Sequence, residues 1–156
     1  MSCIVKTVDE ILQAEFNLPM GLADTSKITV ERSIDQSKDK RFSDGKKKET
    51  VKIHKVQLLD PATGTGTFLA EAVSRIHDKF NGQAGMWQGY VGEHLLPRLN
   101  GFELLMTSYT MAHLKLDWIL TETGYKADDN ERLRVFLTNS LEEHHLSLIH
   151  ISEPTR

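Results

Sequence analysis

The chain has 156 residues, of which 39% are hydrophobic and 26% are charged, and its formal net charge is −3. This length leaves room for one domain at most, and the composition is that of an ordinary globular protein. The slight negative charge excludes a general electrostatic attraction to nucleic acid, so any contact with DNA has to be local or made by sequence outside this chain.

Residues 1–30 are expected to form a lead-in of one helix and one short strand. Apolar residues recur at helical spacing over residues 7–16, and Thr7 is a candidate N-cap for that helix. Residues 28–30 then predict a short strand. The intervening Pro19 and Gly21 indicate a turn between the two elements.

Residues 31–50 are almost entirely charged or polar, with only Ile34 and Phe42 as apolar exceptions. This composition predicts a polar loop or insertion. Its three consecutive lysines, Lys46, Lys47 and Lys48, could contact DNA phosphates, although a short charge run is more often a solvated loop.

The most informative segment is 56–69, where an apolar run ends on Asp60 and Pro61 and two glycines, Gly64 and Gly66, alternate with threonines. An apolar-periodic stretch follows from Phe68. Glycine lets the backbone turn sharply and approach a ligand, and proline stops the strand. The pattern therefore predicts a strand, a tight turn and a helix, with the Asp60 carboxylate at the carboxyl end of the strand, where open α/β sheets bind ligands.

Three kinds of glycine-containing turn are compatible in outline with this segment. A phosphate-binding P-loop requires a lysine after its second glycine, and none follows Gly66. A dinucleotide-binding turn requires a third small residue, but Leu69 stands there. The remaining pattern, Asp-Pro-x-x-Gly-x-Gly-x-Phe over residues 60–68, is the one that the chain satisfies in full.

The residues after this turn predict further alternating elements. Helices are expected after the turn to about residue 80, within 83–96 and over 104–120, and strands over 97–104 and 134–141. The helix over 104–120 is apolar on most of its faces, which is expected when both sides are packed. Thr65 or Thr67 is the expected cap of the first of these helices. The order of elements indicates an α/β fold with a parallel sheet and right-handed crossovers.

The turn over 60–68, together with the segments 86–87, 90–104, 105–116 and 134–141, resembles the methylase region of type I single-polypeptide (type ISP) restriction–modification enzymes. These large proteins combine an adenine-N6 DNA methyltransferase with helicase-like and nuclease parts. The resemblance runs from about Val8 to His145, is densest over 56–121, and covers only a slice of such an enzyme. It implies a Rossmann-like S-adenosylmethionine-dependent methyltransferase fold, truncated after about three parallel strands, within residues 51–145.

The resemblance also assigns cofactor-binding residues. Those of the glycine loop would wrap the methionine part of S-adenosylmethionine, with Asp60 holding its α-amino group: Asp60, Pro61, Ala62, Thr63, Gly64, Thr65, Gly66, Thr67 and Phe68. Glu103 would accept hydrogen bonds from both ribose hydroxyls, and the alternative is an exposed strand end. Asn139 stands where many relatives carry an aspartate for the adenine amine, and the alternative is a turn formed by an Asn-Ser pair.

No catalytic residue is assigned. Amino-methyltransferases of this kind use an Asn/Asp-Pro-Pro-Tyr/Phe tetrapeptide, which does not occur in this sequence. No metal site is expected either, because the adjacent His144 and His145 lack a ligand cluster at suitable spacing and fit an exposed position. Residues 146–156 resemble a peptide that recurs at the ends of unrelated reading frames and are expected to be a non-native tail, although their apolar spacing could imitate a helix.

The sequence therefore predicts the cofactor-binding part of a DNA adenine-N6 methyltransferase, inactive alone. Its expected partners are double-stranded DNA, reached through the full-length parent, and the parent's helicase-like, nuclease and target-recognition parts. Two alternatives stay open: a non-catalytic nucleotide-binding or interaction module, and a methyltransferase that acts on RNA or protein. The single cysteine, Cys3, and the absence of a signal peptide or an apolar run of about 18 residues favour a cytoplasmic location and no membrane partner.

Overall fold

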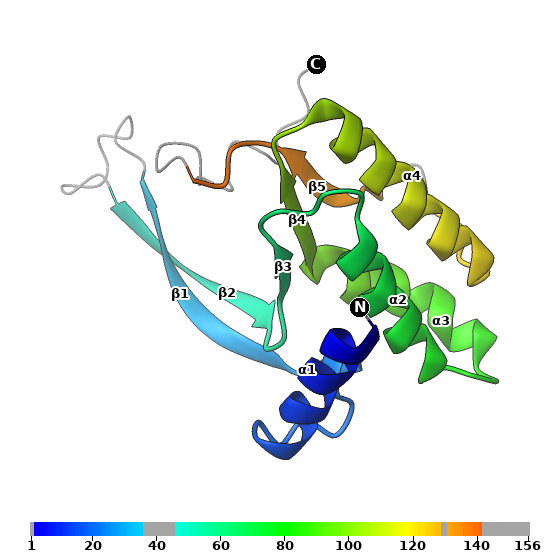
Figure 1. Ribbon diagram of the computed structural model, residues 1–156. Helices are drawn as coiled ribbons and strands as arrows, with labels where there is room; N and C mark the ends of the chain where they lie inside the picture. Colours follow the sequence, from blue (N-terminus) through cyan, green and yellow to red (C-terminus); the bar gives the residue numbers. More distant parts are fainter. Residues whose placement is uncertain (1, 36–45, 129–130, 142–156) are drawn as a thin grey trace. The chain divides into compact units, whose positions relative to one another are not determined.

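A computed structural model describes residues 2–35, 46–128 and 131–141 (Figure 1). Residues 25–56 form one compact unit, here called the ribbon unit, and the described residues before and after them form a second, the α/β unit. The helices and strands in chain order are α1 (Ser2–Ala14), β1 (Lys27–Asp35), β2 (Lys46–His54), β3 (Leu58–Asp60), α2 (Thr67–Asp78), α3 (Ala84–Tyr90), β4 (Leu99–Glu103), α4 (Met106–Glu122) and β5 (Arg134–Leu137).

The α/β unit contains a three-stranded parallel sheet in the order β3-β4-β5. The register pairs Leu58 with Leu99 in the first ladder and Glu103 with Leu137 in the second. Helices α2 and α4 pack against each other, and α4 contacts both β4 and β5. The predicted α/β class with three parallel strands is thus confirmed at this level.

The core of this unit is built from the apolar stripe of α2 and the facing residues of α4 and the sheet. Val73 and Ile76 of α2 and Leu116 of α4 are completely buried. Burying a side chain of this size stabilises the fold by about 1.5–3 kcal/mol. The spacing of the stripe, which recurs every three to four residues, explains why residues 67–78 form a helix.

The segment between α2 and β4 is longer than a simple crossover needs. It contains α3, a π-helical turn at Val91–Leu95 and a 3₁₀ turn at Leu96–Arg98 that ends at the start of β4. Trp87 of α3 is buried and its indole Nε1 donates to Thr123 Oγ1 at 3.0 Å. The shorter helix expected within 83–96 is confirmed, and it anchors the segment to the end of α4.

The N-terminal helix differs from the prediction at its start. Helix α1 begins at Ser2, so Thr7 lies inside the helix and its hydroxyl donates to the Cys3 carbonyl at 2.9 Å. The expectation that Thr7 caps the helix is therefore wrong. A threonine hydroxyl bonds back to the carbonyl four residues earlier when the helix continues around it.

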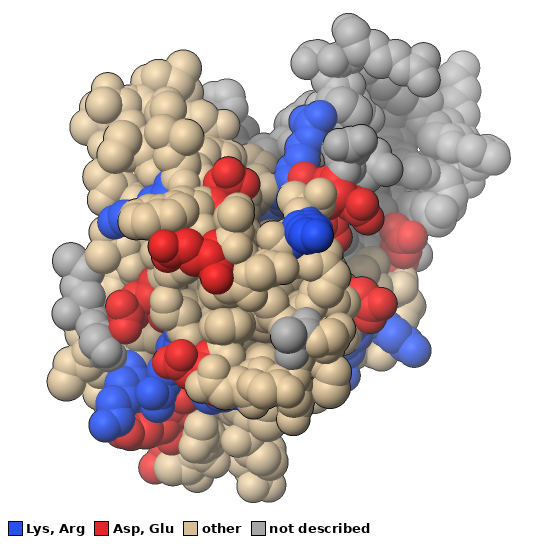
Figure 2. All heavy atoms as spheres, turned by 90° about the vertical axis from the view of Figure 1, so that its right-hand side faces the viewer, with Lys and Arg blue, Asp and Glu red and all other residues tan. Residues whose placement is uncertain are grey.

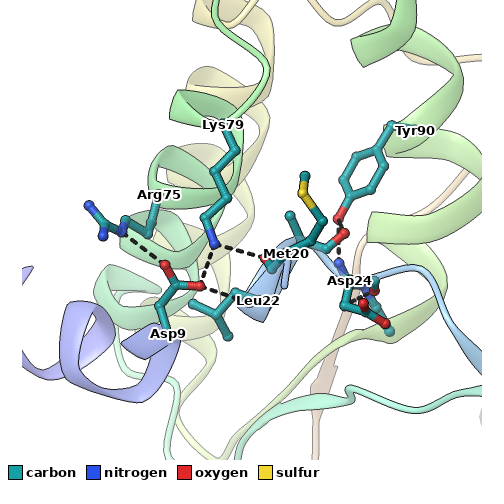
Figure 3. Close-up of polar contacts among 9 residues, drawn as sticks. Asp9, Met20, Leu22, Asp24, Arg75, Lys79 and Tyr90 are labelled. Carbon is teal, nitrogen blue, oxygen red and sulfur yellow. Dashed lines mark hydrogen bonds and ion pairs between the residues drawn. The ribbon is translucent and has the colours of Figure 1, made fainter. Parts of the chain in front are cut away.

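Polar contacts bind this N-terminal segment to α2 and the residue after it, and Figure 3 shows them. The buried Asp9 accepts hydrogen bonds from Leu22 N at 2.8 Å and from Lys79 Nζ at 2.5 Å on one oxygen, and from Arg75 Nε at 3.3 Å on the other. Lys79 Nζ also donates to the Met20 carbonyl at 2.8 Å. We call these five residues the Asp9 clasp: Asp9, Met20, Leu22, Arg75 and Lys79. They join α1 and the turn that follows α1 to α2.

A second group of contacts fixes the end of the same segment. The Tyr90 hydroxyl donates to the Ala23 carbonyl at 3.0 Å, and Arg98 Nη1 donates to the Asp24 carbonyl at 3.0 Å. Arg98 is fully buried and also donates to the Tyr90 hydroxyl. The segment up to residue 24 is therefore part of the α/β unit, and the unit boundary differs from the expected division at residue 30.

Helix α4 is packed on one side only. Ala112, Leu116 and Leu120 are buried, whereas Met111, Leu114 and Trp118 are 48%, 60% and 64% exposed. The expectation that both sides of this helix are packed is thus wrong for the described structure. Figure 2 faces the side of Figure 1 on which α3 and α4 lie, and most of the surface drawn in colour there is neither acidic nor basic.

The ribbon unit corrects the prediction for residues 31–50. Strands β1 and β2 pair antiparallel from Lys27 opposite His54 to Asp35 opposite Lys46. Cross-strand pairing therefore extends through residues that were expected to form a loop, and only 36–45 between the strands lie outside the described part. The side chains of Lys46, Lys47 and Lys48 are also outside it. No helix among the described residues is both long and apolar enough to cross a membrane.

Candidate functional site

The predicted site residues lie where parallel strands end. Strand β3 ends at Asp60 and β4 ends at Glu103, while Asn139 follows β5 by two residues. Because the three strands are parallel and adjacent, their carboxyl ends share one edge of the sheet. The edge is tied together by backbone hydrogen bonds from Thr63 N to the Phe102 carbonyl at 3.0 Å and from Thr138 N to the Glu103 carbonyl at 2.8 Å.

The glycine loop folds back onto the neighbouring strand. Thr63 is buried, its hydroxyl donates to the Asp60 carbonyl at 3.0 Å, and its own carbonyl accepts from Gly66 N at 2.9 Å. A Cβ on Gly101 of β4 would lie 2.5 Å from Thr63 Oγ1. The absence of a side chain at Gly101 therefore leaves the space in which Thr63 is buried. The sequence did not indicate this requirement, because it depends on a residue that is a neighbour only in the folded protein.

Gly66 is required for two reasons. Its φ of +76° lies in the left-handed region, and a Cβ there would lie 3.1 Å from Ala112 Cα of α4. Gly66 is the N-cap residue immediately before α2, and no side-chain hydrogen bond caps that end of the helix. The expectation that Thr65 or Thr67 caps it is wrong, and their hydroxyls instead lie 3.3 Å from each other.

Glu103 contacts the glycine loop directly. Its Oε2 accepts from Gly64 N at 2.7 Å, and its Oε1 accepts from Leu104 N at 3.0 Å and Leu105 N at 2.8 Å. The hydrogen bond from Leu105 N, with those from Gly64 N and Leu104 N, holds the pKa of this carboxyl below its usual range, although its slight burial acts in the opposite direction. The carboxylate is thus ionised and fixed in orientation beside the loop.

Asp60 has one oxygen that is satisfied and one that is not. Oδ1 accepts from Ala62 N at 3.2 Å, whereas Oδ2 is buried and has no hydrogen-bond partner among the described residues. A buried carboxylate oxygen without a donor is costly, because it has lost its hydration. The position therefore favours a donor that comes from outside the chain.

The other predicted residues differ in exposure. Pro61, Ala62 and Thr65 are exposed on the loop, and Phe68 in the first turn of α2 is 40% exposed. The side-chain oxygen of Asn139 accepts from Leu141 N at 3.1 Å, which is the contact of a local turn. The structure thus brings the Asp60–Thr67 loop and Glu103 together, whereas the hydrogen bond from Leu141 N ties Asn139 to its own turn.

One side chain at the loop was missed by sequence analysis. Lys115 of α4 donates from Nζ to Thr67 Oγ1 at 2.9 Å, which places a cation at the first residue of α2. Lys115 is the only lysine or arginine in α4, and this was the feature that could have drawn attention to it. Its contact depends on the packing of α4 against α2, which spacing along the chain does not give.

An open hollow of about 230 Å³ lies elsewhere. It is lined by Gly92, Leu96, Pro97, Glu131, Arg132 and Arg134. Pro97 precedes β4 and Arg134 begins β5, so this hollow is at the amino ends of the strands, opposite to the Asp60–Glu103 edge. We place the candidate site at the carboxyl edge because the carboxylates and glycines converge there.

Metal ligands do not converge within the part of the chain that the structure describes, where no three His, Cys, Asp or Glu side chains could hold an ion. His144, His145 and residues 146–156 lie outside the described residues. Comparisons with protein-family models, with proteins of known function and with solved structures find no match for this chain.

Proposed function

We propose that the chain is the cofactor-binding part of an S-adenosylmethionine-dependent DNA adenine-N6 methyltransferase from a restriction–modification enzyme. The observation that carries this proposal is the 2.7 Å hydrogen bond from Gly64 N to Glu103 Oε2, at the carboxyl edge of a parallel sheet. It joins the two segments that the resemblance assigns to the methionine and ribose parts of one ligand. Asn139 is proposed as the adenine contact on the resemblance alone.

The chemistry of these residues fits the proposed cofactor. The ammonium of its methionine part would donate to Asp60 Oδ2, the buried oxygen that has no partner among the described residues. At Gly64, whose φ is +55°, an added Cβ would meet only the Ala62 carbonyl oxygen, at 4.0 Å, so the backbone allows close approach of a ligand. The cofactor would supply an electrophilic methyl group, and the loop would orient it.

Glu103 fits the ribose with one change in the loop. A carboxylate offers about four lone-pair positions, and three backbone N–H groups already use Glu103. Two ribose hydroxyls therefore need Gly64 N–H to leave Oε2. We propose that the Gly64 bond holds the loop closed on the sheet until the ligand replaces it.

The substrate assignment follows from the resemblance. Duplex DNA is the proposed substrate, and its target adenine would be flipped out of the helix and methylated by the complete parent enzyme. The parent's helicase-like, nuclease and target-recognition parts are the proposed partners.

Isothermal titration with S-adenosylhomocysteine tests the site. The 156-residue chain should bind with a micromolar-to-millimolar dissociation constant, and Asp60→Ala should weaken binding at least about tenfold because it removes the charged partner of the ammonium. Asp117→Ala, which removes an exposed carboxylate on α4, is the matched control and should leave binding unchanged. Equal affinities for the wild type and Asp60→Ala would refute the assignment of the loop. Binding of ATP in preference to S-adenosylhomocysteine would instead favour a nucleotide-binding module.

A further inference from the structure

Charge is divided unequally between the two units of the chain. Residues 25–56 carry ten Lys and Arg against five Asp and Glu, whereas the rest of the chain carries nine against seventeen. The ribbon unit therefore has a formal charge of +5, and the remaining residues have −8. The net charge of −3 hides this division.

The basic residues are concentrated on one strand. Residues 46–55 include five lysines and a single acidic residue, Glu49, and they form β2 and the residue after it. Four of these lysines, Lys46, Lys47, Lys48 and Lys52, belong to the sequence of β2 itself. Residues two apart on a strand are about 6.6 Å apart, so successive positions can meet different phosphates of a nucleic-acid strand.

The described side chains place exposed lysines along the ribbon. Lys27, Lys52 and Lys55 are exposed, and the pairing of Lys27 with His54 and of Thr29 with Lys52 puts Lys27 and Lys52 on the same face. Glu31 and Glu49 are also exposed on the ribbon, and their charges are included in its balance of +5.

We infer that the β1–β2 ribbon binds duplex DNA through its phosphate backbone. A two-stranded antiparallel ribbon is narrow enough to enter the major groove, and lysines bind phosphates by releasing condensed counterions. The choice of duplex DNA rests on the proposed function, and the attraction to phosphates rests on the ribbon alone. The acidic remainder of the chain repels DNA, so the ribbon would be the part of the chain that meets the duplex.

A second explanation of the lysines leads to a different result. Lysines on an exposed edge strand also protect a protein from pairing with other copies. If protection were their role, replacing them would cause association of the chain and would leave DNA binding unchanged. Light scattering on every variant separates the two effects.

Fluorescence anisotropy with a labelled duplex of about 20 base pairs, without cofactor, tests the inference on the 156-residue chain. The variant combines Lys27→Gln, Lys52→Gln and Lys55→Gln. The matched control combines Lys6→Gln, Lys126→Gln and Arg132→Gln, three exposed cations of the α/β unit, so that both proteins have the same net charge. A third protein carries Lys→Arg at the three ribbon positions and keeps the charge.

The wild type should bind more weakly as salt rises from about 50 to 200 mM. A plot of the logarithm of the binding constant against the logarithm of the salt concentration should have a slope of about −0.9 per phosphate contacted. The ribbon variant should reduce the slope by about 2 to 3 and weaken binding about ten- to hundredfold at the lower salt concentration. The control and the Lys→Arg protein should stay within about twofold of the wild type. Undetectable binding by the wild type, or equal losses in the variant and the control, would overturn the inference.

Cofactor titration keeps this test separate from the proposed function. The ribbon variant should bind S-adenosylhomocysteine like the wild type, and Asp60→Ala should bind DNA like the wild type. A wild type that binds DNA but not S-adenosylhomocysteine would count against the methyltransferase proposal. A wild type that binds S-adenosylhomocysteine but not DNA would count against the role of the ribbon. If the ribbon variant does not fold, as judged by circular dichroism, the single substitution Lys52→Gln replaces it, with an expected slope change of about 1.

Discussion

At the scale of single residues, Glu103 connects local structure to the proposed chemistry. Its two oxygens bind backbone N–H groups both from its own strand end and from the glycine loop 39 residues earlier. A glutamine keeps the shape of this side chain but replaces one acceptor with a donor. That donor would face a backbone N–H or a ribose hydroxyl that itself needs an acceptor.

Glu103→Gln should therefore weaken binding of S-adenosylhomocysteine by about 1–3 kcal/mol, which is about five- to 150-fold. Glu122→Gln, an exposed glutamate in the last turn of α4, is the control and should change nothing. A 2′-deoxyribose analogue of the ligand should bind the wild type less well, with little further loss in Glu103→Gln. Additive losses would show that Glu103 does not contact the ribose.

At the scale of elements, Gly66 sets how closely α2 approaches α4. Gly66→Ala forces an alanine into the left-handed region and adds a Cβ 3.1 Å from Ala112 Cα. Gly82→Ala is a matched control, because Gly82 has a similar φ of +82° and no atom within 4 Å of the added Cβ.

Both substitutions should therefore lower the free energy of unfolding by about 1 kcal/mol because of the positive φ. Gly66→Ala should lose a further 1–3 kcal/mol, roughly, because the helices are overpacked. Chemical denaturation at neutral pH measures both variants. Equal losses would mean that α4 can move away from the loop without cost.

The Asp9 clasp is the second feature at this scale. Asp9→Ala leaves Lys79 Nζ and Leu22 N without this acceptor and should cost about 2–4 kcal/mol of unfolding free energy. The cost is moderate for a buried pair because the side chains of Lys79 and Arg75 are 19% and 36% exposed and can turn to water. Glu10→Ala, next in sequence and exposed, is the control and should cost less than about 0.5 kcal/mol.

The clasp also predicts a dependence on pH. Burial alone would raise the pKa of Asp9, but the hydrogen bonds and charge of Lys79, with Leu22 N and Arg75, bring it below its ordinary value. A lowered pKa in the folded state gives stability that is fully present above the ordinary carboxyl value near pH ~4 and is lost as the pH falls through the folded value. The difference in melting temperature between wild type and Asp9→Ala should therefore shrink below about pH 4. A difference that stays constant as the pH falls well below about 4 would contradict the ionised clasp.

At the scale of the whole molecule, the proposed cofactor site is present without the residues that would hold a target base. The Asn/Asp-Pro-Pro-Tyr/Phe tetrapeptide does not occur in the 156 residues. Without it a flipped adenine is not positioned against the methyl group, and the rate advantage of proximity is lost.

The purified chain should therefore bind S-adenosylhomocysteine but transfer no methyl group to DNA. Incubation with tritiated S-adenosylmethionine and duplex DNA measures the transfer, with a complete adenine methyltransferase as the positive control. Incorporation above background by the wild type that is lost in Asp60→Ala would contradict the prediction.

The sequence alone determined the elements whose causes are local. The apolar run before Asp60, the alternating glycines and the apolar stripe from Leu69 to Ile76 specify a strand, a turn and a helix through backbone freedom and side-chain periodicity. The order of the later helices and strands followed from the same periodicities, and with it the α/β class. Asp60 and Glu103 were recognised at strand ends because a charged residue after an apolar run marks the end of a strand.

Tertiary structure decided every feature that depends on partners distant in the chain. Strands β1 and β2 exist because they pair with each other, and their charged residues gave no strand pattern. Gly64 meets Glu103 across 39 residues, and Asp9 meets Lys79 across 70. Such contacts arise when parallel strands align their ends and helices pack, which local propensity does not encode. For the same reason, the sequence of α4 did not show which of its apolar residues are exposed. The exposure of Trp118 follows from how α4 packs against its neighbours in the fold.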